Sequence, residues 1–213
     1  MNIKVEPFKN NIGASISCDL KLIEPKIITQ IKKTLNNFGF VCFRNQNLEP
    51  GEYLRFAEQL GRIKEYPMLK DLENYKGITV VERKESDKGK SYGEGWHTDS
   101  SYLDETPKYT CLMGKIVKKD QGQTLFASQL ASYEALDQET KDKIENLIGI
   151  FSSAGPISVT RLEREAERGT GKSKDFIAEH PIVRKVGNKK TLYLSPGHTI
   201  AIKNLDEEES KDL

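Results

Sequence analysis

The chain has 213 residues, enough for one domain with a substantial core, and its 33 basic and 32 acidic side chains leave a formal net charge of +1. This near balance argues against a nucleic-acid-binding protein and against an acidic tail. Because the amino terminus lacks a signal-peptide core and no apolar run is long enough to span a bilayer, we expect a cytoplasmic protein without a membrane partner.

The first third of the chain predicts two strands and two helices. Residues 12–18 alternate apolar with small polar side chains, as a half-buried strand does. Pro25 suits the first turn of an amphipathic helix that ends at Gly39. Residues 40–43 are all apolar and predict a strand buried on both faces. Residues 49–61 predict a second amphipathic helix.

The three cysteines predict no metal or redox site. Cys18, Cys42 and Cys111 are odd in number, widely separated and set among apolar neighbours. They lack the paired short spacing of a zinc site or a redox dithiol. We interpret them as buried, inert thiols.

The stretch from Gly93 to Tyr102 carries the strongest chemical signal. His97 and Asp99 are two residues apart, so in a strand both side chains would point to the same face. One imidazole and one carboxylate are two of the three ligands in the facial triad that holds Fe(II) in non-haem oxygenases. The tripeptide alone is a weak signal, and a structural His97 is an equal alternative at this point.

The middle of the chain predicts further strands and helices. We expect strands at residues 78–81, 109–117 and 124–127. Ser128 is a suitable N-cap for a short helix, and Asp137 caps another that runs to residue 148.

The last third predicts strands around a charged segment. Residues 160–175 are rich in Arg, Glu, Lys and Gly, which is typical of solvated surface, and the functional alternative is a mobile lid. Strands are expected at 180–183, 191–195 and 198–202, with a turn at Gly187. Asp206, followed by three glutamates, predicts a helix start. Because only about two turns follow, we expect the chain to be a fragment that is incomplete at its C-terminal end.

Several motifs in this order resemble one known family. They are Trp96-His97-Thr98-Asp99-Ser100-Ser101-Tyr102, Gly122-Gln123-Thr124-Leu125-Phe126-Ala127-Ser128, Tyr133-Glu134-Ala135-Leu136 and His180-Pro181-Ile182-Val183-Arg184. This set is similar to the taurine dioxygenase/TfdA (TauD/TfdA) family of Fe(II)- and 2-oxoglutarate-dependent dioxygenases, from about residue 10 onward. The resemblance implies one domain over residues 1–213, mixed α+β and mainly β. Its core would be a double-stranded β-helix (a cupin-like jelly roll) with flanking α-helices.

The resemblance also implies the site. His97 and Asp99 would be Fe(II) ligands, and the Thr124 hydroxyl would bind a carboxylate of 2-oxoglutarate. Family members carry a further His ligand and an Arg that binds 2-oxoglutarate, both expected beyond residue 213. His198 is interpreted as facing the substrate, with metal ligation and simple packing as alternatives. The other substrate-contacting positions are Tyr66, Leu69 and Gly93, where the taurine enzyme has different side chains.

The implied function is hydroxylation of a small, anionic organic substrate, a sulfonate, sulfate or carboxylate, by O2 with release of succinate and CO2. A homo-oligomer is compatible with this reading. One alternative is a non-catalytic jelly-roll binding module or degraded relative without a complete metal site. Another is a cupin-type enzyme that uses a different divalent metal without 2-oxoglutarate, and the Thr124 motif weighs against it.

Overall fold

The computed structural model describes residues 3–66, 70–87, 93–157 and 175–213, which form two compact units. Unit 1 comprises residues 1–80 and 108–128, and unit 2 comprises residues 81–107 and 129–213. Each unit has its own apolar core. The expected lid at 160–175 lies outside the described residues, except for Asp175.

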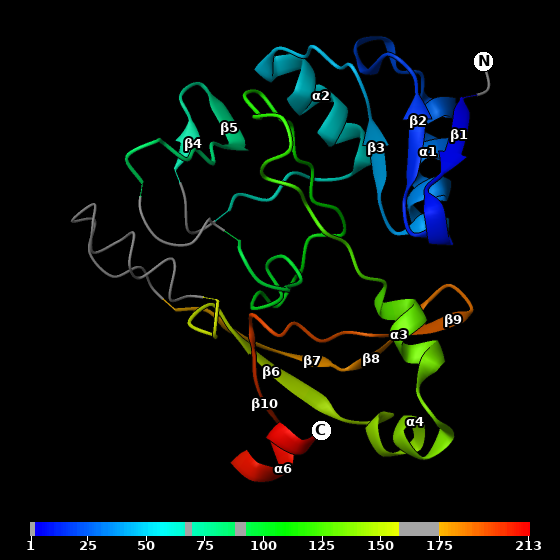
Figure 1. Ribbon diagram of the computed structural model, residues 1–213, viewed down its shortest axis with the longest axis vertical. Helices are drawn as coiled ribbons and strands as arrows, with labels where there is room; N and C mark the ends of the chain where they lie inside the picture. The colour runs from blue at the N-terminus through cyan, green and yellow to red at the C-terminus, as the bar shows by residue number, and fades with distance from the viewer. Residues whose placement is uncertain (1–2, 67–69, 88–92, 158–174) are drawn as a thin grey trace. The chain divides into compact units, whose positions relative to one another are not determined.

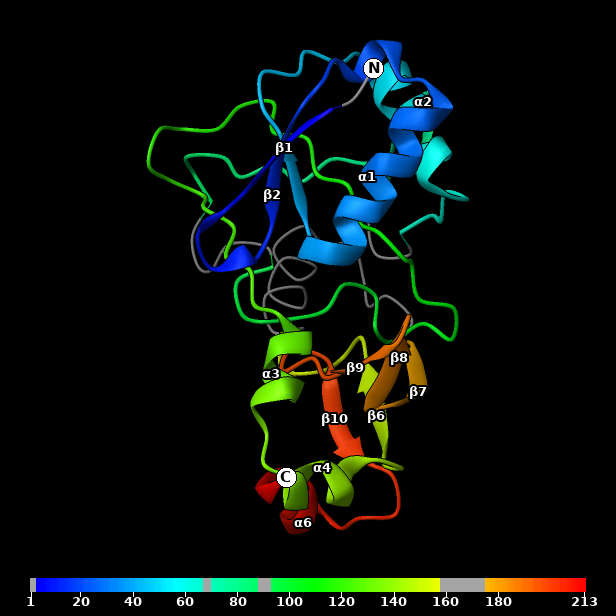
Figure 2. The ribbon, with the colours of Figure 1, turned by 90° about the vertical axis from the view of Figure 1, so that its right-hand side faces the viewer.

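Unit 1 is built on a three-stranded sheet with a helix on one face (Figures 1 and 2). Strand β1 (Lys4–Pro7) pairs antiparallel with β2 (Ala14–Ser17), which pairs parallel with β3 (Val41–Phe43). The connection between the parallel strands contains α1 (Pro25–Phe38), as expected from Pro25 and Gly39. Apolar residues of α1 pack against Ile16 of β2 in the core. The helix therefore supplies the long crossover that a parallel pair needs.

Unit 1 also contains other helices and strands. They are η1 (Lys9–Asn11), η2 (Leu20–Leu22), α2 (Pro50–Leu60), β4 (Asp71–Leu72) and β5 (Tyr75–Thr79). The predicted α2 begins at a capping box, in which Glu49 and Glu52 satisfy each other's backbone N–H groups. Residues 109–113 return to this unit, where Tyr109, Cys111 and Met113 pack against the core.

Unit 2 contains a second three-stranded sheet and a hairpin. The sheet has the order β10-β6-β7 and is antiparallel, with β6 (Ile148–Ser152) between β7 (Ile177–Pro181) and β10 (Thr199–Ile202). Strands β8 (Val183–Val186) and β9 (Lys189–Leu192) form the hairpin, joined at the predicted turn by Gly187 and Asn188. Helix α3 (Gln129–Ala135) packs against β9.

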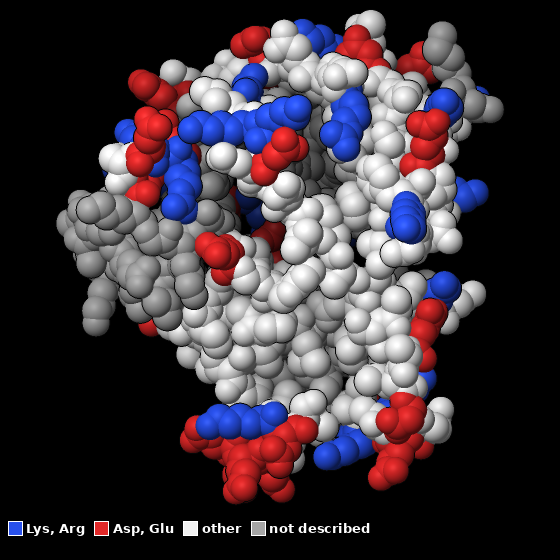
Figure 3. Space-filling model, in the orientation of Figure 1, with Lys and Arg blue, Asp and Glu red and all other residues white. Residues whose placement is uncertain are grey.

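In the part of unit 2 that the structure describes, two further helices are present. Helix α4 (Gln138–Ile144) starts at the predicted N-cap Asp137. Helix α6 (Glu207–Asp212) starts at Asp206 with a capping box, as predicted. Figure 3 shows acidic side chains gathered around α6 with basic side chains beside them. Within this helix, Lys211 forms an ion pair with Glu207. No helix in the described parts of the chain has the length and apolar character needed to cross a membrane.

Several strand predictions differ from the structure. Residues 109–117 and 124–127 form no strand, and Ile116 is 96% exposed. Residues 40–43 give a strand that is half-buried instead of fully buried. The helix predicted to reach residue 148 ends at Ile144, and Ile148 begins β6, the central strand of its sheet. The reason is that strand pairing depends on partners far away in the sequence, which local alternation does not reveal.

Candidate metal-binding site

His97 and Asp99 bring an imidazole nitrogen and a carboxylate oxygen to one point in unit 2. The Nε2 atom of His97 lies 3.2 Å from Oδ1 of Asp99. Both side chains are accessible from solvent, with 26% of the His97 and 48% of the Asp99 side chain exposed. The predicted convergence of the two groups is therefore present.

The hydrogen bond of the other ring nitrogen, Nδ1, determines the tautomer of His97. Nδ1 lies 2.8 Å from the carbonyl oxygen of Gly95, and a carbonyl oxygen only accepts, so Nδ1–H is the donor. In the neutral ring, Nε2 then carries the lone pair that faces Asp99. A backbone acceptor behind the ring is the usual arrangement around metal-ligating histidines.

The electrostatics of the pair also suit a cation. The hydrogen bond to the Asp99 carboxylate raises the pKa of His97, and burial opposes this shift. Without a cation, the lone pair of Nε2 faces the Asp99 oxygen, and a hydrogen bond between the two atoms needs a proton on Nε2. A divalent metal ion would serve both at once, so the donor set fits a metal of the Fe(II) type. Among the described residues, no group of three His, Cys, Asp or Glu side chains gathers here or elsewhere.

The backbone around the pair is not the predicted strand. Residues 97 and 98 belong to no helix, strand or turn, and a turn follows from Asp99. Positive φ angles at Gly95 (117°) and Ser100 (51°) bend the chain on either side. One backbone bond anchors the start of the segment, from the N–H of Gly197 to the carbonyl oxygen of Trp96, at 3.0 Å.

Two glycines lie against His97. A Cβ atom at Gly93 would come within 3.5 Å of the His97 Cε1 and 3.9 Å of Nε2. A Cβ atom at Gly197 would lie 3.1 Å from Cβ of His97 and 3.0 Å from Cβ of Ile157. Gly93, an expected substrate contact, is thus beside Nε2 of His97, and its role stays a prediction.

His198 lies next to His97 and is buried. The two rings are 6.0 Å apart, and the edge-to-face contact with Tyr102 measures 4.9 Å between centroids. Nδ1 of His198 is 3.0 Å from the hydroxyl of Ser101 and 3.2 Å from the carbonyl oxygen of Thr98. The ring is therefore held beside the candidate site, and its substrate-facing role stays a prediction.

Thr98, between the two candidate ligands, is held by residues that the sequence did not single out. Its N–H donates to the Ser195 hydroxyl at 3.0 Å, and its hydroxyl accepts from Nε2 of Gln129 at 2.9 Å. Both partners are far away in sequence. No local pattern marks either residue, and only the fold brings them together.

The other predicted site residues belong to unit 1 or lie outside the described chain. Thr124 is exposed, and Tyr66 is half-buried. The segment after Thr124 is attached to its unit by Phe126, whose ring stacks on Phe40 at 3.8 Å between centroids. Leu69 lies outside the described residues. The relation of Thr124 and Tyr66 to His97 therefore stays a prediction.

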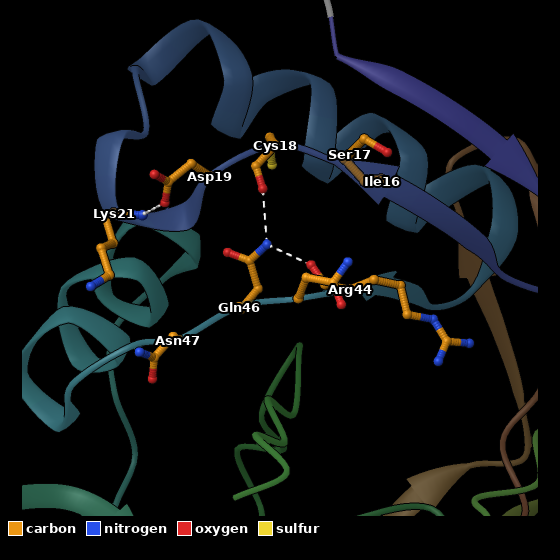
Figure 4. Close-up of a pocket in the computed structure, with 9 residues that line it drawn as sticks. Ile16, Ser17, Cys18, Asp19, Lys21, Arg44, Gln46 and Asn47 are labelled. Atoms are coloured by element: carbon orange, nitrogen blue, oxygen red, sulfur yellow. Dashed lines mark hydrogen bonds between the residues drawn. The ribbon is translucent and has the colours of Figure 1, made fainter.

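A rival site is an open pocket of about 510 Å³ in unit 1, shown in Figure 4. Gln46 crosses it and bonds the carbonyl oxygens of Cys18 and Arg44. The Asp19 carboxylate accepts from the N–H of Lys21, and the Arg44 side chain extends away from Gln46. The polar groups of this pocket thus serve local structure more than a common ligand.

Comparison with known proteins places these features in a family context. The model of the family described as "Taurine catabolism dioxygenase TauD, TfdA family" matches residues 4–213. An alkylsulfatase of Acinetobacter baylyi is 28% identical, and the match covers 92% of this chain and 63% of the relative. An alpha-ketoglutarate-dependent sulfate ester dioxygenase of Pseudomonas putida is 24% identical over 94% of this chain and 68% of its own. The chain thus spans about two thirds of the length of these relatives.

Two solved structures have the same fold at low identity. AAD-2 in complex with Mn(II) and N-oxalylglycine superposes with a TM-score of 0.72 at 22% identity, over 99% of this chain and 75% of the other. A taurine dioxygenase of Burkholderia xenovorans gives a TM-score of 0.69 at 20% identity, over 100% and 70% of the two chains. These likenesses support the fold alone. The family match over residues 4–213 establishes that this chain belongs to the TauD/TfdA family.

Proposed function

We propose that this chain is the metal-binding part of an Fe(II)- and 2-oxoglutarate-dependent dioxygenase. The observation that carries the proposal is the His97–Asp99 pair, with Nδ1 of His97 committed to Gly95 and Nε2 directed at the carboxylate. Family membership supports the same chemistry, because several relatives are named as alpha-ketoglutarate-dependent dioxygenases. The fold proposed with it is the double-stranded β-helix of one domain.

In this proposal His97 and Asp99 hold the metal ion. The bound Fe(II), with 2-oxoglutarate and O2, supplies the oxidising chemistry that hydroxylates a C–H bond and releases succinate and CO2. The Gly95 carbonyl orients the His97 ring by accepting its Nδ1 proton. The Thr124 hydroxyl donates to a carboxylate of 2-oxoglutarate. Gly93 leaves room beside Nε2 because a larger side chain would approach the ring.

The proposed substrate is a small organic anion. Relatives are named for sulfate esters, sulfonates and phenoxypropionate, all of which carry a negative charge. His198 is the proposed substrate contact in unit 2, since it is held next to His97 by Ser101. Tyr66 and Leu69 are the proposed contacts from the other part of the chain. The reaction partners are this small molecule and O2, in the cytoplasm.

The experiment is an assay of succinate release by the complete natural protein. Fe(II), 2-oxoglutarate and O2 are supplied with a panel of sulfonates, sulfate esters, phosphonates and carboxylates. Asp99→Ala is expected to abolish Fe(II)-dependent succinate release, because the metal loses its anionic ligand. Asp104→Ala, an exposed acid nearby in sequence, is the matched control and should retain activity.

The outcomes separate the possible functions. Activity retained in Asp99→Ala would refute the assignment of the metal site. Fe(II) binding that depends on Asp99, without succinate release for any compound of the panel, would favour a non-catalytic binding module.

A further inference from the structure

Gln129, at the start of α3, connects two segments of unit 2 that are far apart in the sequence. We propose that Gln129 is a positioning residue, which holds Thr98 and thereby sets the His97 and Asp99 side chains before a metal ion binds. The inference rests on the proposed function, since it needs the pair to be a metal site. It assigns no contact with the metal or the substrate to Gln129 itself.

The amide of Gln129 is almost fully used. Its Oε1 accepts from the N–H of Leu194 at 2.8 Å, and its Nε2 donates to the carbonyl oxygen of Leu194 at 2.8 Å. The second hydrogen of Nε2 is directed to the Thr98 hydroxyl at 2.9 Å. The side chain thus pairs with the Leu194 backbone as a neighbouring strand would, and this pairing fixes the nitrogen that reaches Thr98.

Thr98 is bound from two directions. While Gln129 holds its hydroxyl, the N–H of Thr98 donates to the Ser195 hydroxyl at 3.0 Å, and Ser195 is fully buried. Leu194 and Ser195 are consecutive, so both bonds tie Thr98 to the same short segment. The threonine is therefore held in position by groups from two other segments of the chain.

The need for such support follows from the exposure of the ligands. About half of the Asp99 side chain and a quarter of the His97 side chain are open to solvent, so packing constrains them only in part. Thr98 lies between them in the sequence, so the position of its backbone affects the positions of both His97 and Asp99. Residues that orient metal ligands without touching the metal typically change metal affinity by about 10–100-fold when they are replaced.

The experiment is a Co2+ titration of the complete protein, followed by the visible d–d absorption of the bound ion. Gln129→Met keeps the length of the side chain and removes its amide. Thr98→Val keeps the β-branched shape and removes the hydroxyl that Gln129 binds, together with the 3.4 Å bond that this hydroxyl donates to the Leu194 carbonyl oxygen. Gln138→Met is the matched control, because the Gln138 amide bonds Asp142 on the exposed surface of α4.

We expect Gln129→Met and Thr98→Val each to weaken Co2+ binding by about 10–100-fold and to change the d–d spectrum. The double variant should bind no more weakly than the weaker single variant, since both changes break the same bond. Gln138→Met should bind as the wild type does. Urea unfolding of the metal-free variants is measured alongside, to separate altered affinity from general destabilisation.

Two results would overturn the inference. One is unchanged Co2+ affinity and spectrum in Thr98→Val, which decides the matter even if Gln129→Met does not fold. The other is additive loss of affinity in the double variant, which would mean that the two residues act separately. His97→Ala tests the proposed function independently. If it leaves Co2+ binding intact, the metal site itself is misassigned, whatever the Gln129 variants do.

Discussion

At the scale of single residues, the candidate site depends on space as much as on ligands. Gly197 and Gly93 lie where a side chain would meet His97. The contact at Gly197 is the tighter one, because a new Cβ atom would face the Cβ atoms of His97 and Ile157, which move only with their backbones. A methyl group there must shift His97, Ile157 or the turn that holds Gly197.

Gly197→Ala is therefore expected to weaken metal binding and to lower the free energy of unfolding by about 1–3 kcal/mol, the usual cost of overpacking. Co2+ titration and urea unfolding measure the two effects. Gly51→Ala, in the first turn of α2, is the control, because its Cβ atom would make an ordinary contact of 3.5 Å with Tyr75 of β5. Unchanged affinity and stability in Gly197→Ala would show that the turn adjusts without cost.

His180 gives a pH dependence that is separate from the candidate site. It is buried on β7, its Nε2–H donates to the Leu103 carbonyl oxygen at 3.0 Å, and its ring packs against Phe151 and Tyr193. Burial lowers the pKa of His180, and the charge of Arg184 lowers it further. The folded state therefore resists a proton that the unfolded chain accepts near pH 6.5.

The direction of the pH dependence follows from the difference in the pKa of His180 between the folded and the unfolded state. The contribution of His180 to stability is present above about pH 6.5 and is lost as the pH falls from there through the lowered folded-state pKa. We expect the free energy of unfolding to drop between pH 7 and pH 5, and to drop less in His180→Gln, whose amide still donates to Leu103. Urea unfolding at several pH values measures the slope. Equal slopes for both proteins would contradict the assignment.

The sequence predicts the His97–Asp99 pair but not the residues that hold it, and the reason lies in distance along the chain. His97 and Asp99 are two residues apart, so their convergence is a local property that spacing predicts. It holds even though the segment is not a strand. Gln129 and Ser195 lie 31 and 97 residues from Thr98, and a glutamine or serine at such a distance carries no recognisable pattern.

At the scale of elements, helices are predicted better than strands, because helices depend on local patterns and strands on distant partners. The predicted α1, α2 and α6 are present because apolar periodicity and capping residues act within the helix itself. Strand β6 was missed because its partners, β7 and β10, come much later in the chain. The turn of the hairpin between β8 and β9 is predicted, since its residues are local. The strands expected at 180–183 and 191–195 lie instead at Val183–Val186 and Lys189–Leu192, and residues 180 and 181 belong to β7.

The turn of this hairpin tests the role of backbone conformation alone. Gly187 takes a φ of 61°, and no atom lies within 4 Å of where its Cβ would be. Gly187→Ala is expected to lower the free energy of unfolding by about 1–2 kcal/mol, because an L-residue pays that amount in the left-handed region. Gly61→Ala is the matched control, with equally open space and an extended φ of 171°. Equal effects of both changes on urea unfolding would refute the conformational explanation.

At the scale of the whole molecule, the structure has two apolar cores, whereas the sequence predicts a single domain. Ile31, fully buried, belongs to the core of unit 1, and Ile182 belongs to the core of unit 2. A single domain unfolds in one cooperative transition, to which both cores contribute. Separate domains would unfold independently, so the two possibilities differ in a measurable way.

The only tryptophan of the sequence, Trp96, lies in unit 2 and reports on that unit by fluorescence. Ile31→Ala removes a buried side chain from unit 1 and should lower the free energy of unfolding by about 2–5 kcal/mol. If the chain is one domain, this change lowers the urea midpoint of Trp96 fluorescence as much as that of far-UV circular dichroism. Lys33→Ala, on the exposed face of α1, is the control and should leave both midpoints unchanged. An Ile31→Ala protein that keeps the wild-type fluorescence midpoint would show instead that the two units fold independently.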